Sequence, residues 1–186
     1  MRLVRTLAAL ISLSVTCCAA FAQQSSNILK QNAVWIQKGI SWDRMEEETD
    51  PHRTYAGARL LYFGPDGKFG VFQGVVIKTR KSMALSEGDG EMVFGGEWNL
   101  VNGAALVSYR LVSWYKIMLR EGQKPPVVPG EVLHGKVQLV KSDVQSEPGW
   151  HIEFEGKKYV PESGLKASVL RSHLEIHELH PLDGQQ

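Results

Sequence analysis

Hydrophobic and polar residues alternate along residues 57–116, and glycine-rich turns divide this stretch into short segments. In one segment, Phe94, Trp98 and Leu100 fall on alternate positions, which is the period of two that a half-buried strand requires. The run 107–117 repeats this pattern, and a helix would scatter its charges around the cylinder. The stretch therefore predicts an antiparallel β-meander.

Turn residues support this prediction. The sequence Gly-Pro-Asp-Gly at 64–67 combines a proline that presets φ with glycines that accept positive φ, so the chain can reverse there. Asn102 and Gly103 form a two-residue hairpin signal. Gly95 and Gly96 lie inside a strand pattern, where they predict a bulge or a sharp bend that curls the sheet.

Further strand patterns lie on both sides of the meander. Residues 34–42 alternate before it, residues 132–140 alternate after it, and residues 150–154 and 157–160 form a hairpin around Glu155 and Gly156. The chain therefore predicts an all-β fold, in which an antiparallel meander of about eight strands curls into a small barrel or a barrel-like sheet. Whether that sheet closes is left open.

The segment 165–179 fits two structures. A helix would place Leu165, Val169 and Ile176 on one stripe with His173, whereas a strand would place Leu174 and Ile176 on one face. We favour a strand from about Arg171 onward, which would help to close the sheet.

The first 22 residues have the pattern of a secretory signal peptide. Arg2 and Arg5 precede an apolar core at 7–15, and Ala20-Phe21-Ala22 places small residues at the positions that determine cleavage. We expect cleavage before Gln23, with an uncleaved anchor or a lipid on Cys17 or Cys18 as alternatives. The protein should then act in the periplasm or outside the cell, as a single β-rich domain over residues 23–186.

Charge and composition exclude some classes of function. Both cysteines lie in the predicted signal peptide, so the mature chain would have no disulfide and no cysteine nucleophile. Without Arg2 and Arg5, the 21 basic residues fall to 19, against 20 acidic residues. This balance gives no electrostatic footprint for nucleic acid. Residues 23–186 hold no apolar stretch of transmembrane length.

The C-terminal histidines form the one suggestive cluster. On a helix, His173 and His177 would lie on one face and could bind a metal ion together, with His180 nearby. On a strand, the first two would lie about 13 Å apart, too far for one ion. We interpret the cluster as a polar edge and keep metal binding as an alternative. The chain has no recognisable catalytic motif, so we predict neither enzymatic activity nor a cofactor.

The segment Gly96-Glu97-Trp98 leads into a hairpin with residues 106–115. It resembles the glycine-x-tryptophan motif of lipocalin-like barrels, although in lipocalins that motif lies at the first strand. The resemblance implies a non-enzymatic protein that holds a small hydrophobic molecule inside the barrel. The predicted pocket residues are Phe94, Trp98, Tyr109 and Leu111.

Two alternatives to this exported ligand carrier stay open. One is a structural domain of the envelope, with a filled core, that binds a protein partner through a strand edge or a long loop. The other is a periplasmic metal-binding protein that uses the C-terminal histidines.

Overall fold

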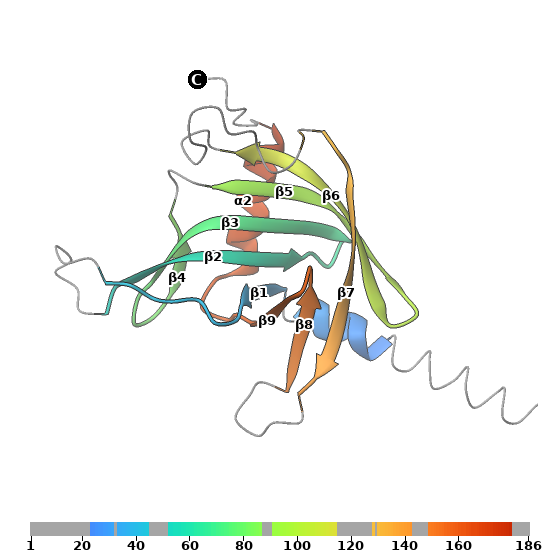
Figure 1. Ribbon diagram of the computed structural model, residues 1–186, viewed down its shortest axis with the longest axis horizontal. Helices are drawn as coiled ribbons and strands as arrows, with labels where there is room; N and C mark the ends of the chain where they lie inside the picture. The colour runs from blue at the N-terminus through green and yellow to red at the C-terminus, as the bar shows by residue number, and fades with distance from the viewer. Residues whose placement is uncertain are drawn as a thin grey trace, which may run out of the picture.

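The computed structural model describes residues 23–31, 33–44, 52–86, 91–114, 128, 130–142 and 149–179. The predicted signal peptide, with Cys17 and Cys18, lies outside these residues, as does His180. The described residues form a helix over residues 23–31, nine strands and the C-terminal helix α2 (Figure 1). The elements are β1 (Val34–Gln37), β2 (Thr54–Phe63), β3 (Lys68–Lys78), β4 (Met83–Leu85), β5 (Met92–Val101), β6 (Ala104–Trp114), β7 (Leu133–Lys141), β8 (Trp150–Phe154), β9 (Lys157–Pro161) and α2 (Ala167–Leu179).

Eight of the strands close into an antiparallel barrel. Their order around it is β1, β2, β3, β5, β6, β7, β8 and β9, and β9 pairs again with β1. Neighbours in the barrel are therefore neighbours among these strands along the chain, as in an up-and-down barrel. The short strand β4 is additional and pairs with the end of β3. The predicted all-β barrel of about eight strands is confirmed, and its sheet closes.

Two of the predicted hairpins turn on pairs of residues with positive φ. Asn102 and Gly103 connect β5 to β6 with φ angles of 51° and 79°, and Glu155 and Gly156 connect β8 to β9 with φ angles of 49° and 70°. Two successive positive φ angles match the right-handed twist of the strands on either side. The Asn-Gly turn predicted from the sequence is confirmed.

The predicted bulge lies at a different position. The register between β5 and β6 shifts at Val93 and Phe94, not at Gly95 and Gly96. Gly96 instead permits a close approach of two strands, because a Cβ atom there would lie 2.0 Å from the carbonyl oxygen of Ser108.

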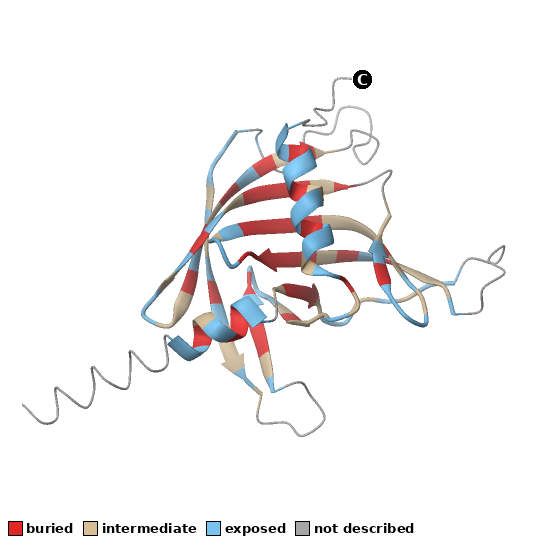
Figure 2. Ribbon diagram, turned by 180° about the vertical axis from the view of Figure 1, so that it is seen from behind, coloured by how far each residue is buried: buried red, intermediate tan, exposed pale blue. Residues whose placement is uncertain are grey.

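The barrel interior is packed with aromatic and aliphatic side chains. Figure 2 shows buried positions along the strands of the barrel. Among them, the ring centroids of Phe63 and Trp98 lie 5.6 Å apart, and those of Phe69 and Tyr109 also lie 5.6 Å apart. Leu29, in the helix over residues 23–31, belongs to the same buried cluster. This helix leads directly into β1, so it covers the end of the barrel at which β1 begins.

A second buried cluster lies on the outer face of the barrel, beneath α2. Leu170 and Leu174 of the helix pack there in a cluster with Tyr62, Phe72 and Val93. Strand β3 is therefore covered on both faces, because Phe69 and Val71 point inward while Phe72 and Val76 point outward.

The sequence-based preference for a strand in the C-terminal segment is wrong. Residues from Ala167 to Leu179 form α2, and its buried residues are Leu170, Leu174 and His177, at the spacing of one helical face. The stripe expected for a helix is wrong in part, because Leu165 is buried but Val169 and Ile176 are exposed. Neither helix in the described part of the chain is long and apolar enough to cross a membrane.

Candidate metal centre

Three buried side chains capable of binding a metal ion meet between α2 and the outer face of the barrel. They are Glu91, His173 and His177, and each offers one ligand atom within 4.8 Å of the other two. Their side chains are 7%, 11% and 9% exposed, respectively. Among the residues that the structure describes, this is the group of histidine and acidic residues whose spacing suits a metal ion.

The helix places the two histidines together. His173 and His177 are four residues apart on α2, so their side chains lie one above the other on the same face. Their ring centroids are 4.5 Å apart, with the ring planes at 78°. The ring of Phe72, on β3, lies 5.8 Å from that of His173 and gives the site an apolar wall.

The carboxylate of the site comes from Glu91, at the start of β5. Glu91 directly precedes β5, and Met92 packs against the barrel interior. Successive side chains on an extended chain point to opposite sides, so Glu91 points outward, beneath α2. The chain therefore brings an acidic side chain under the helix from a position remote in sequence.

The three side chains already contact one another. The Nε2–H group of His173 donates a hydrogen bond to Oε1 of Glu91. The Nε2 atom of His177 lies 3.9 Å from Oε2 of the same carboxylate. Both histidines thus direct their Nε2 atoms towards Glu91. A metal ion bound here would take the place of the proton between His173 and Glu91.

The donor set favours Zn²⁺ or a similar transition metal. Two imidazole nitrogens and one carboxylate oxygen suit Zn²⁺, whereas Ca²⁺ and Mg²⁺ prefer oxygen ligands. Bond lengths of about 2.0–2.1 Å in a tetrahedral site place ligand atoms about 3.3 Å apart. Since the largest separation is at most 4.8 Å, side-chain rotations that close it by about 1.5 Å would complete three-point coordination.

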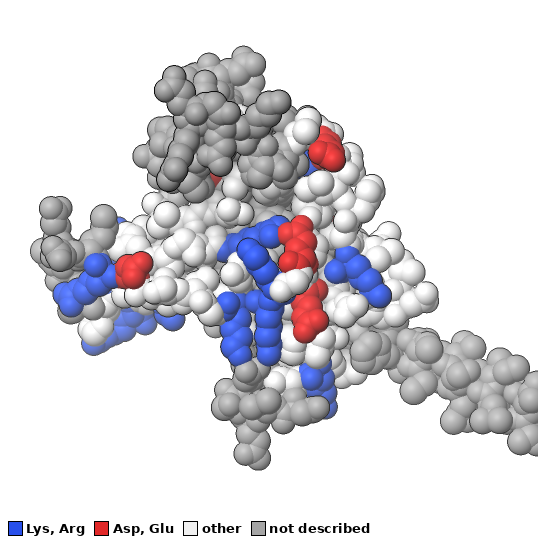
Figure 3. All heavy atoms as spheres, viewed as in Figure 1, with Lys and Arg blue, Asp and Glu red and all other residues white. Residues whose placement is uncertain are grey.

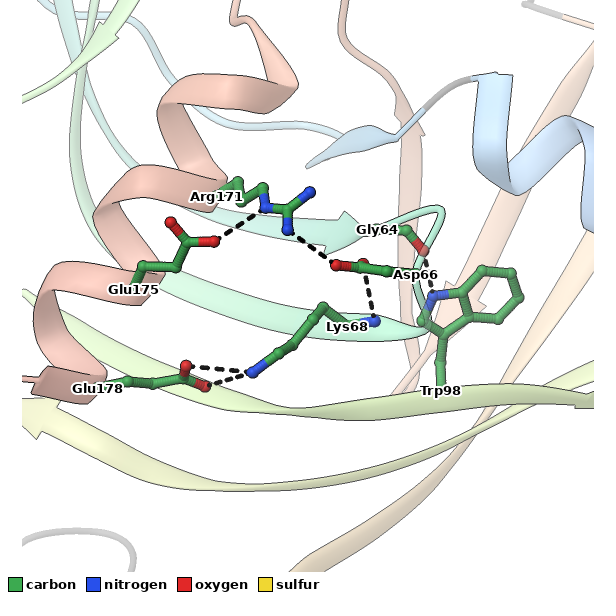
Figure 4. A network of polar contacts seen from close by, with 7 residues as sticks. All are labelled: Gly64, Asp66, Lys68, Trp98, Arg171, Glu175 and Glu178. Carbon is green, nitrogen blue, oxygen red and sulfur yellow. Dashed lines mark hydrogen bonds and ion pairs between the residues drawn. The ribbon is translucent and has the colours of Figure 1, made fainter.

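Polar contacts join α2 to the turn between β2 and β3 (Figure 4). Arg171 pairs with Asp66 at 3.1 Å, and Lys68 pairs with Glu178 at 3.2 Å. The indole Nε1 of Trp98 donates a hydrogen bond of 2.9 Å to the carbonyl oxygen of Gly64 in the same turn. Exposed ion pairs such as these contribute little free energy each.

Sequence reasoning found two of the three candidate ligands. The predicted residues His173 and His177 come together, while the third predicted residue, His180, lies outside the described residues. The acidic residues near them in sequence face other partners, because Glu175 binds Arg171 and Glu178 binds Lys68. Glu91 was missed, and its position ahead of a strand carries no local signal of metal binding.

The four predicted pocket residues all lie inside the barrel. Phe94, Trp98, Tyr109 and Leu111 are 6%, 8%, 3% and 7% exposed and belong to the interior cluster. The ring centroids of Phe94 and Tyr109 lie 6.0 Å apart, so these side chains pack against one another. Their role in binding a ligand stays a prediction.

No known protein family, curated protein or solved structure was found to match the chain. The resemblance to lipocalin-like barrels therefore stays a prediction. The fold and the site together define an eight-stranded antiparallel barrel with a candidate metal centre under its C-terminal helix.

Proposed function

We propose that this protein is an exported, non-enzymatic barrel that binds one divalent transition-metal ion, Zn²⁺ in the first place, through Glu91, His173 and His177. The observation that carries the proposal is the convergence of three buried ligand atoms within 4.8 Å of one another, from two elements remote in sequence. A local cluster of surface charges would not combine burial with this spacing.

The depth of the site favours binding over catalysis. All three side chains are at most 11% exposed, and they lie between a helix and a sheet. Three protein ligands leave the fourth tetrahedral position of Zn²⁺ to a water molecule, and burial between helix and sheet keeps a substrate away from it, whereas a catalytic zinc site keeps this position accessible. The proposed role is therefore to hold the ion and, with it, to fasten α2 to the barrel.

The geometry favours metal binding over the carriage of an apolar molecule. The predicted pocket residues are in contact with one another, and the rings of Phe69 and Phe154 fill the interior beside them. Export is supported by the signal-peptide pattern of the sequence. A ligand site built from imidazole and carboxylate would also function without thiols, which the predicted mature chain lacks.

A competition titration tests the proposal. Residues 23–186 are purified without a metal-affinity column, stripped with a chelator, and titrated with Zn²⁺ against a chromophoric chelator. We expect one ion per chain, and a loss of at least about tenfold in affinity for His177→Ala and for Glu91→Gln. The control is His134→Ala, because His134 is an exposed residue of β7. Equal affinities for the wild type and His177→Ala would contradict the proposal.

A further inference from the structure

Helix α2 carries an apolar stripe on the side turned away from the barrel. Val169, Ile176 and Leu179 are 44%, 56% and 74% exposed, respectively. Leu170 and Leu174, which pack on the barrel, lie on the other side of the helix. In Figure 2, α2 lies in front of the barrel, with exposed positions along its outer side. The helix therefore has two apolar faces, of which one packs on the barrel and the other faces solvent.

The exposed stripe has the spacing of a contact between two helices. Val169, Ser172, Ile176 and Leu179 follow one another at intervals of three, four and three residues, and all four are exposed. Alternating intervals of three and four residues place side chains along one seam, as at the a and d positions of a coiled coil. The stripe therefore suits a second helix.

The charges of α2 run against the dipole of the helix. Arg171 lies in its first half, whereas Glu175 and Glu178 lie in its second half, and its first turn has no acidic residue. A helix dipole favours the opposite distribution, and an ion pair four residues apart is weaker when the basic residue comes first, as in the pair of Arg171 with Glu175. Asp66 and Lys68 of the barrel offset only part of this, because the side chains of Arg171 and Glu175 stay about half exposed.

A second α2 in the antiparallel direction would match the stripe. With a two-fold axis at the level of residue 174, Val169 of one copy lies opposite Leu179 of the other. In the same register, Ser172 lies opposite Ile176, so that a small side chain meets a large one. The stripe is therefore complementary to itself, as a two-fold interface requires.

The charges are complementary in the same arrangement. Arg171, Glu175 and Glu178 lie along the flank of α2 that faces the turn between β2 and β3 (Figure 4). In an antiparallel pair, this flank meets the same flank of the second copy in the reverse direction, which brings Arg171 of each copy near Glu175 and Glu178 of the other. A parallel pair would bring like charges together. The charges thus favour a second copy of this chain, in the antiparallel direction, as the partner.

The face of the barrel away from α2 has a different character. Figure 3 shows this face, on which Lys and Arg side chains lie next to Asp and Glu side chains. A surface of mixed charges is typical of one that stays in contact with water. The apolar stripe is therefore a local feature of α2.

We propose that the exposed face of α2 is the contact surface of a symmetric dimer, in which the α2 helices of two copies of this chain pack antiparallel. A helix of 13 residues is about 20 Å long, so two such helices form an interface at the small end of the usual range. The dimer should therefore be reversible, with a dissociation constant of about 10 μM or more. The candidate metal ligands lie beneath the helix, so the proposal does not depend on the metal centre.

Sedimentation velocity tests the dimer. Residues 23–186 are measured in a metal chelator at protein concentrations from about 10 μM to about 1 mM, and the average mass should rise from that of one chain towards that of two. Ile176→Glu places a charge in the apolar seam and should weaken the dimer at least about tenfold. Leu106→Glu is the matched control, because Leu106 is an exposed apolar residue of β6, and it should associate as the wild type does.

Engineered cysteines test the direction, since residues 23–186 contain no cysteine of their own. A mixture of Val169→Cys and Leu179→Cys should form a disulfide between the two variants. Val169→Cys alone should not, because the two copies of residue 169 would lie about 15 Å apart in the antiparallel pair, whereas a disulfide needs Cα atoms within about 7 Å.

Three results would overturn the proposal. The first is a protein that stays monomeric at about 1 mM, which would leave the stripe to a different partner. The second is an Ile176→Glu variant that associates as tightly as the wild type. The third is a Val169→Cys variant that cross-links to itself as readily as to Leu179→Cys.

Discussion

Glu91 accepts a hydrogen bond from His173, although the two residues are 82 positions apart in the chain. The contact joins the start of β5 to α2 on the outside of a barrel that closes without the helix. With His177 at 3.9 Å from the same carboxylate, it forms both a tether for α2 and a candidate site for a metal ion.

Replacing Glu91 should loosen this tether even without a metal ion. Glu91→Gln preserves the shape of the side chain but replaces the carboxyl group that is hydrogen-bonded to His173 with an amide. Because the site is buried, we expect the free energy of unfolding in a chelator to fall by about 1–3 kcal/mol, as measured by urea denaturation. Glu97→Gln, at an exposed position of β5, is the control, and an equal effect of both changes would contradict the expectation.

Zinc should stabilise the folded protein. An ion that binds only the native state adds a free energy of about 2.7 kcal/mol at a concentration 100 times its dissociation constant. Thermal denaturation with and without Zn²⁺ should therefore show a rise in Tm for the wild type and for His134→Ala. His173→Ala should lose most of the rise. A rise of the same size in His173→Ala would place the stabilising ion elsewhere.

Gly95 should be intolerant of a side chain because α2 lies over it. A Cβ atom at this position would lie 2.9 Å from Cδ1 of Leu174 and 2.9 Å from Cγ2 of Val112. Gly95→Ala should reduce stability by about 1–3 kcal/mol and speed amide hydrogen exchange in α2. Gly57→Ala is the control, since a Cβ atom there meets nothing within 4 Å. Unchanged exchange in α2 would contradict this packing.

The pH dependence of stability should report on Glu155. Its hydrogen bonds to Arg59 and Tyr109 outweigh burial and lower its pKa below the ordinary value of 4.5. The ionised carboxylate therefore contributes stability above about pH 4.5, and this contribution is lost as the pH falls through the lower pKa of the folded state. The difference in unfolding free energy between the wild type and Glu155→Gln should shrink from about pH 6 to about pH 3. A difference that stays constant over this range would contradict the assignment.

Local patterns were sufficient to predict the barrel. Strand periodicity and the turn at Asn102 and Gly103 are properties of neighbouring residues, and they gave the hairpins and the strand count. The C-terminal segment was different, because its residues fit both a helix and a strand. The outer face of the barrel decides between them, since Leu170 and Leu174 bury their side chains there only as a helix.

The candidate metal site could be predicted only in part for a similar reason. The spacing of His173 and His177 is visible in the sequence, but its meaning depended on the structure of the segment. The third side chain comes from the start of a remote strand, and the curvature of the barrel determines that it lies under the helix. Local sequence patterns therefore cannot predict that Glu91 contacts His173 and His177.

X-ray absorption spectroscopy of the zinc-loaded protein tests the central claim most directly. The spectrum reports the ligands around the ion, and we predict nitrogen and oxygen ligands at about 2.0–2.1 Å, including two imidazoles, with one ion per chain. In His177→Ala, the spectrum should show one imidazole ligand in place of two. A wild-type spectrum without imidazole, or a chain that retains no stoichiometric zinc, would contradict the account.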